Sequence, residues 1–168
     1  MKPKRSLVIG TLLAGAMAAS VPMGVHAAEN DTERKAVYYS RTVSLIQSDQ
    51  NVEGLDHGDL FLREQAVSRT LNGPTIGVAF SQAEVVAHHV EDDVDVRRIM
   101  IQSYLPKGEI FTIGTSQSPR GATPRPGWTT TYAIIGGTGK YKGARGVEKI
   151  TLLEDGVTFR IEYTYTTS

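Results

Sequence analysis

The stretch Ala133–Tyr165, AIIGGTGKYKGARGVEKITLLEDGVTFRIEYTY, carries the clearest fold signal in the chain. From residue 157 onward apolar and polar residues alternate, and the apolar set is Val157, Phe159, Ile161, Tyr163 and Tyr165. Successive side chains of a β-strand point to opposite faces of the sheet. The pattern therefore predicts a strand with one face in a core and the other in water.

Five glycines lie between Gly136 and Gly146, immediately before this strand pattern. They do not form a P-loop, because Ile134 stands where the first glycine is needed and Tyr141 follows Lys140. They do not form a dinucleotide fingerprint either, because Lys142 occupies its last glycine position. We expect these glycines to permit tight or positive-φ backbone between two strands rather than to hold a phosphate.

The rest of the chain shows further β-favouring runs separated by turn residues, and no helical run of useful length. The eight predicted strands are Val37–Gln47, Gly58–Val67, Thr75–Ala87, Asp95–Leu105, Glu109–Thr115, Thr129–Ile135, Gly146–Leu153 and Val157–Thr166. Short connections make an antiparallel sheet the expected arrangement. Eight strands favour an all-β fold, a closed eight-stranded antiparallel β-barrel, with a sandwich as the alternative.

The first 27 residues have the features of a signal peptide cleaved near Ala27: a basic start, an uncharged apolar run and small residues at 25 and 27. The expected organisation is a signal peptide at 1–27, a flexible segment at 28–36 and one barrel domain at 37–168. The protein is then secreted, to a periplasm or outside the cell. The leader holds three of the 18 basic residues and no acidic ones, so the mature net charge is −3. This charge argues against nucleic-acid partners and against membrane binding of the mature form.

The glycine-rich stretch AIIGGTGKYKGARG resembles the late signature of dirigent proteins, and allene oxide cyclases carry a looser version. The segments GDLFLREQAVS and GPTIGVAFSQAEVV resemble earlier strands of the cyclases, in the same order. The resemblance covers roughly residues 37–166. It implies an eight-stranded barrel with an apolar cavity, a small hydrophobic or aromatic ligand, no cofactor, and assembly as a homotrimer or homodimer.

The resemblance also points to site residues. Arg145 matches the arginine of the dirigent Ala-Arg-Gly signature, which is linked to catalysis there, and the alternative is a surface arginine flanked by glycines. Both families place a carboxylate on the first strand, whereas residues 37–46 hold none here. Lys140 stands where many dirigents have an aspartate.

Glu64 is the candidate substitute acid, because it shares a strand face with Leu60 and Leu62, and an apolar setting raises a carboxyl pKa. The alternative is that Glu64 points outward from the barrel. Arg63, on the opposite face, aligns loosely with a polar residue of the cyclases. Tyr104 and Tyr132 are expected to line a cavity and offer phenol hydroxyls, with ordinary core packing as the alternative.

The stretch HHVEDDVD, residues 88–95, predicts a solvated hairpin tip and no metal site, because adjacent strand histidines point to opposite faces. Three functions stay open on the residues alone. One is a cofactor-independent cyclase or dirigent-like protein that steers cyclisation or stereoselective coupling. The second is a non-catalytic lipocalin-like binder, and the third is a barrel packed solid.

Overall fold

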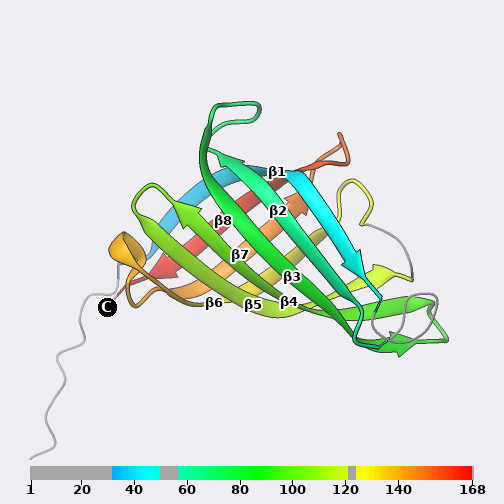
Figure 1. Cartoon of the computed structure of the whole chain (residues 1–168). Helices are drawn as coiled ribbons and strands as arrows, with labels where there is room; N and C mark the ends of the chain where they lie inside the picture. Colours follow the sequence, from blue (N-terminus) through cyan, green and yellow to red (C-terminus); the bar gives the residue numbers. More distant parts are fainter. Residues whose placement is uncertain (1–31, 50–56, 121–123, 168) are drawn as a thin grey trace, which may run out of the picture.

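The computed structural model describes residues 32–49, 57–120 and 124–167. In these ranges eight strands form one closed barrel in which each strand is antiparallel to its neighbours, and β1 closes the barrel against β8 (Figure 1). The strands are β1 (Arg34–Ser48), β2 (Leu60–Ser68), β3 (Thr75–His89), β4 (Val94–Leu105), β5 (Gly108–Pro119), β6 (Thr129–Gly137), β7 (Arg145–Leu152) and β8 (Thr158–Thr166). The predicted fold class is confirmed.

All eight predicted strands are present, with shifted ends. β1 starts at Arg34 rather than Val37, and β5 runs on to Pro119 rather than ending at Thr115. Most of the residues gained are polar, and they join the sheet through backbone pairing: Arg34 lies opposite Tyr165, and Pro119 lies opposite Val94. The predicted signal peptide, residues 1–27, lies outside the described residues.

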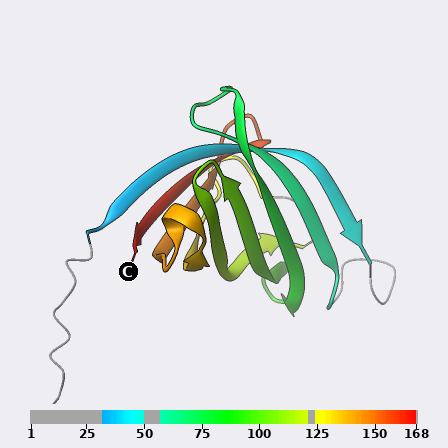
Figure 2. The same ribbon diagram turned by 60° about the vertical axis from the view of Figure 1, so that its left-hand side comes forward.

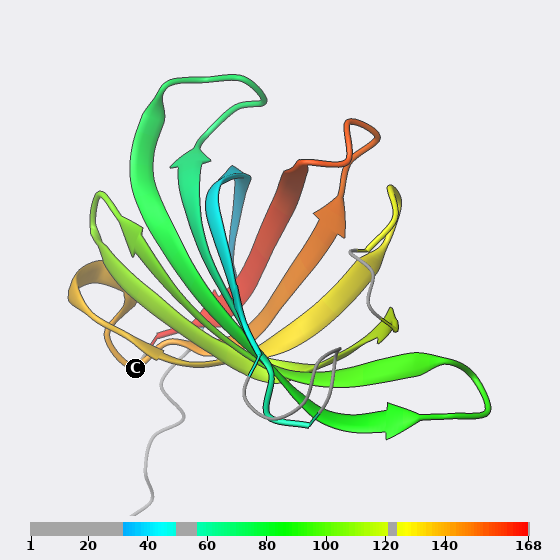
Figure 3. The same ribbon diagram turned by 45° about the vertical axis from the view of Figure 1, so that its right-hand side comes forward.

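β1 is long and bent, and it serves two neighbours in turn (Figure 2). Residues 34–41 pair with β8, and residues 39–48 pair with β2, with a register shift between Thr42 and Ser44. Such an irregularity bends a strand and increases its twist. The β3–β4 hairpin projects beyond the barrel wall, as the bright green ribbon in Figure 3 shows.

One end of the barrel is filled by tyrosines. Tyr38, Tyr141, Tyr163 and Tyr165 are all buried there. The Tyr38 and Tyr141 hydroxyl oxygens lie 3.2 Å apart, and Tyr163 donates to Ser103 Oγ at 2.9 Å. The rings of Tyr38 and Tyr163 meet edge to face at 6.0 Å. This packing closes one end with large side chains whose polar tips are satisfied.

The glycine-rich segment completes this closed end. A short 3-10 helix, η1 (Gly139–Tyr141), follows β6 and inserts Tyr141 into the core. Its backbone docks on the β4–β5 turn, where the Lys140 amide donates to the Lys107 carbonyl at 2.8 Å. A Cβ on Gly137 would lie 2.4 Å from the Glu109 carbonyl oxygen and 2.5 Å from that of Tyr141. The structure therefore confirms that these glycines permit tight backbone packing between two strands.

None of the described residues belongs to a helix that is long and apolar enough to span a membrane.

Alanine substitutions at the neighbouring residues Gly136 and Gly137 test this close packing. We expect Gly137→Ala to lower the free energy of unfolding by about 2 kcal/mol, since two backbone oxygens must move to admit the methyl group. Gly136→Ala is the matched control, because its Cβ would meet only Arg145 Nη1, at 3.8 Å. Urea unfolding of both variants measures the difference, and equal effects would contradict the packing argument.

Candidate functional site

The barrel interior is hollow on the side away from η1. About 70 Å³ of this cavity can hold the centre of a water molecule, and its empty space amounts to about 710 Å³ when the part open to solvent is included. Its walls consist of aliphatic, aromatic and serine side chains together with two arginines and one glutamate. The aromatic and charged lining residues are Phe61, Arg63, Arg97, Trp128, Tyr132, Glu148 and Phe159. A concave, mostly apolar site with a few polar groups is typical of small-molecule binding.

Glu148 is the most unusual group in this cavity. It lies on β7 with its side chain turned inward, like Ile150 and Leu152, and it is fully buried. Thr112 Oγ1 donates a hydrogen bond of 2.6 Å to Oε2, while Oε1 finds no hydrogen-bond partner in the described part of the chain. One carboxyl oxygen is thus anchored, and the other is buried without a hydrogen-bond partner among the described residues.

Burial raises the pKa of Glu148 to about 7, although the hydroxyls of Thr112 and Tyr163 act in the opposite direction. The cause is the loss of water around the ionised form. A carboxyl group that titrates near neutral pH can both accept and return a proton, as a general acid–base group must.

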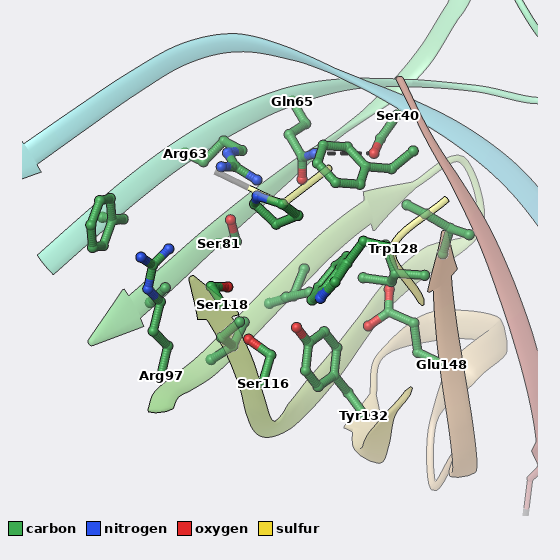
Figure 4. Close-up of a pocket in the computed structure, with 18 residues that line it drawn as sticks. Ser40, Arg63, Gln65, Ser81, Arg97, Ser116, Ser118, Trp128, Tyr132 and Glu148 are labelled. Carbon is green, nitrogen blue, oxygen red and sulfur yellow. Dashed lines mark hydrogen bonds between the residues drawn. The ribbon is translucent and has the colours of Figure 1, made fainter. Parts of the chain in front are cut away.

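Tyr132 lies between this carboxyl and the positive end of the cavity (Figure 4). Burial raises the pKa of Tyr132 to about 12, against the effect of its hydrogen bonds with Ser116 and Thr130. The phenol therefore stays neutral at physiological pH. It offers a hydroxyl for hydrogen bonding and an aromatic face for packing against a ligand.

Two arginines occupy the opposite side of the cavity from Glu148 (Figure 4). The Arg63 guanidinium lies 5.4 Å from the centre of the Phe159 ring, and that of Arg97 lies 4.5 Å from the Phe61 ring. Arg97 Nη2 also donates to Asp95 Oδ2 at 3.2 Å. The pKa of Arg63 is lowered mainly by burial and, to a smaller extent, by the nearby positive charge of Arg97.

The structure brings together two of the five site residues predicted from the sequence, Arg63 and Tyr132, in this cavity. Glu64 instead faces outward, because it alternates with the inward Arg63 and Gln65 along β2. It lines a separate groove on the outer wall together with Leu62 and Phe80, among other residues.

Tyr104 and Arg145 also lie outside the cavity. Tyr104 is 40% exposed and packs edge-on against Phe80, with ring centres 5.9 Å apart. Arg145 is exposed at the start of β7, where its Nη1 donates to the Ala144 carbonyl at 2.8 Å. Tyr104 and Arg145 therefore do not share an aromatic-lined cavity with Glu64.

Sequence reasoning missed Glu148 and Arg97. A signal for Glu148 was present: in the run VEKITL it occupies the same alternation as Ile150 and Leu152. A carboxylate in the apolar register of a strand is a candidate for a buried acid. The acid expected on the first strand is absent there, and the cavity obtains its carboxylate from β7 instead.

The acidic hairpin at residues 88–95 is exposed at residues 89–93, as predicted for a solvated tip, whereas Asp95 is not. Asp95 is buried and has His88 Nδ1 at 3.2 Å from its Oδ1, besides its contact with Arg97. Within the described ranges, no group of three or more His, Cys, Asp or Glu side chains is placed to hold a metal ion.

Comparison with known proteins relates the chain to other barrels through structure only. No protein-family model matches the sequence, and no curated protein sequence matches it. A pyocyanin demethylase superposes with a TM-score of 0.61 at 18% identity, covering 78% of this chain and 99% of the other. The Diels–Alderase AbmU from Streptomyces koyangensis gives 0.61 at 13% identity, with coverages of 84% and 71%.

A pterocarpan synthase dirigent protein gives a TM-score of 0.57 at 13% identity, covering 90% of this chain and 97% of its own. The three proteins share the barrel fold with this chain, and identities this low establish the fold alone. The resemblance to dirigent proteins is thereby confirmed for the fold, while the resemblance to allene oxide cyclases in particular stays a prediction.

The raised pKa of Glu148 makes a prediction about stability. The protonated carboxyl stabilises the fold at acid pH, and this contribution is lost as pH rises from about 4.5 through about 7. We expect Glu148→Gln, which stays neutral, to gain roughly 3 kcal/mol of unfolding free energy relative to wild type over this range.

Urea unfolding between about pH 5 and about pH 8 measures this difference. The exposed Glu64→Gln variant serves as control and is expected to follow the wild-type profile. A constant difference between Glu148→Gln and wild type across the range would show that Glu148 is ionised throughout.

Proposed function

We propose that this protein encloses a small apolar or aromatic molecule in its barrel cavity and steers the cyclisation of that molecule, with Glu148 as the acid–base residue. The single observation that carries the proposal is the fully buried carboxyl group with one unpartnered oxygen in an aromatic-lined cavity. The predicted leader makes secretion part of the proposal.

Cyclisation suits the chemistry of the cavity. It rearranges bonds within one molecule, so a shaped apolar enclosure and one proton shuttle can suffice. Phe61, Trp128 and Phe159 supply flat apolar surface for folding a substrate, and Tyr132 supplies a neutral hydrogen bond. Stereoselective coupling of the dirigent type would in addition require an oxidant from outside the cavity.

The structural neighbours support the proposal at the level of reaction type. One is a Diels–Alderase and one is a pterocarpan synthase dirigent protein, whereas the pyocyanin demethylase shares the fold but not this reaction type. The transfer to this chain rests on the shared fold and on the cavity, since the sequences differ widely.

A non-catalytic lipocalin-like binder is the alternative, and the cavity by itself would serve both functions. Glu148 separates them. A buried carboxyl group with one unpaired oxygen lowers the stability of the fold. A carrier of an apolar ligand would gain nothing in return. An acid–base catalyst needs that arrangement to bring the pKa near the working pH.

A general probe of proton transfer tests the role of Glu148 without knowledge of the substrate. Nitrobenzisoxazole is a flat apolar molecule that opens to a coloured phenolate when a base removes its ring proton. We expect the protein to catalyse this opening, with a rate that rises as pH passes through about 7 and then levels off. Glu148→Gln should lose about 100-fold of the rate.

Arg145→Ala is the control for this assay, and we expect it to keep the wild-type rate, because Arg145 lies outside the cavity. A Glu148→Gln rate equal to wild type would leave the protein as a binder and remove Glu148 from the chemistry. The variant's folding is checked by its thermal melting at the assay pH.

Deletion of the gene in its source organism tests cyclisation itself. The proposed cyclisation neither adds nor removes atoms, so precursor and product have equal mass. We expect the deletion strain to lose the product and to accumulate the precursor. Wild-type protein should restore the product, and Glu148→Gln should not. Mass spectrometry coupled to chromatography resolves the two isomers, and an unchanged metabolite profile would contradict the enzyme hypothesis.

A further inference from the structure

Arg63 carries a positive charge inside the cavity without a matching anion. Among the described residues it has no ion-pair partner, and its buried Nε has no hydrogen-bond partner. Its recorded side-chain contact is with the Phe159 ring, at 5.4 Å. A cation removed from water in this way lowers stability unless another group compensates it.

The neighbouring charges do not neutralise Arg63. Arg97 is a second cation, and its nearness helps to lower the pKa of Arg63. Asp95 pairs with Arg97 and lies within reach of His88, so this carboxylate is already engaged. Glu148 lies on the opposite side of the cavity, beyond Tyr132 (Figure 4).

The surroundings of Arg63 also suit an anion. Ser81 and Ser118 line the same cavity (Figure 4), and their hydroxyls are neutral hydrogen-bond donors. The Phe159 ring lies against the guanidinium, which helps to fix its orientation. A guanidinium presents its N–H groups as a planar fork that matches the two oxygens of a carboxylate.

We propose that the natural ligand is an organic anion, a carboxylate or enolate carried on a conjugated apolar body, with its charged end on Arg63 and its opposite end at Glu148. The inference rests on the proposed function for the cavity and adds the chemical class of the molecule. The ligand's charge would complete the pairing that Arg63 lacks in the described structure. Its apolar body would lie against Phe61, Trp128 and Phe159.

A matched pair of fluorescent probes tests the charge requirement. Anilinonaphthalene sulfonate and phenylnaphthylamine share one aromatic skeleton, and only the first carries an anion. Trp128 is the single tryptophan of the chain and lines the cavity, so quenching of its emission reports binding there. We expect the wild-type protein to bind the anionic probe about tenfold more tightly than the neutral one.

Arg63→Met should abolish that preference by weakening only the anionic probe. Arg98→Met is the matched control, because Arg98 is an exposed residue of β4 that pairs with Glu84. It should keep the wild-type preference. Ala83→Phe, which narrows the cavity, should weaken both probes, whereas probes bound to the outer wall would be unaffected.

The outcomes separate this inference from the proposed function. If neither probe binds, the cavity is not a site for apolar molecules and the proposed function fails. If both probes bind equally to wild type, or if Arg63→Met weakens both equally, the cavity binds ligands but the anion requirement is overturned.

Thermal melting of the ligand-free variants gives an independent readout. We expect Arg63→Met to melt at a higher temperature than wild type, since an unpaired buried charge is replaced by an apolar chain of similar length. A lower melting temperature would show that Arg63 holds the barrel together, and would overturn its assignment to the ligand.

Discussion

Closure of the sheet is the constraint on which the rest of this structure depends. Because β1 pairs with β8, the barrel has no open edge, and every strand must direct alternate side chains inward and outward. A residue's place in the alternation then decides its chemistry. Glu148 and Glu64 are both strand carboxylates, yet one is fully buried and titrates near neutral pH, while the other is exposed on the outer wall.

The two ends of the barrel use the same enclosure differently. At one end Tyr141, carried by η1, packs with Tyr38 and Tyr165 and fills the space between the strands. At the other end four serines and Ala83 lie among the aromatic and aliphatic side chains of the inner face, and a cavity remains. Close packing at the first end supplies the stability that allows the second to stay hollow and polar, as functional sites commonly require.

Three polar groups follow one another across the cavity: the guanidinium of Arg63 lies at one side, the phenol of Tyr132 in the middle and the carboxyl of Glu148 at the other side. Neither charged end is fully satisfied in the described structure, since Arg63 Nε and Glu148 Oε1 both have no hydrogen-bond partner there. Groups held in this state favour a ligand that completes them. The order of the groups would also fix which way such a ligand enters, and this directional binding suits a protein that guides how a molecule folds.

The sequence by itself determined the strand content, the antiparallel barrel and the structural role of the glycines, because alternation and turn residues are local properties of the chain. It also singled out Arg63 and Tyr132. Only the tertiary structure decided which face of β2 points inward, and so exchanged Glu64 for Glu148 as the buried acid. A strand pattern shows two faces but does not say which of them the closed sheet encloses, and desolvation, which sets the pKa of Glu148, exists only once all eight strands surround it.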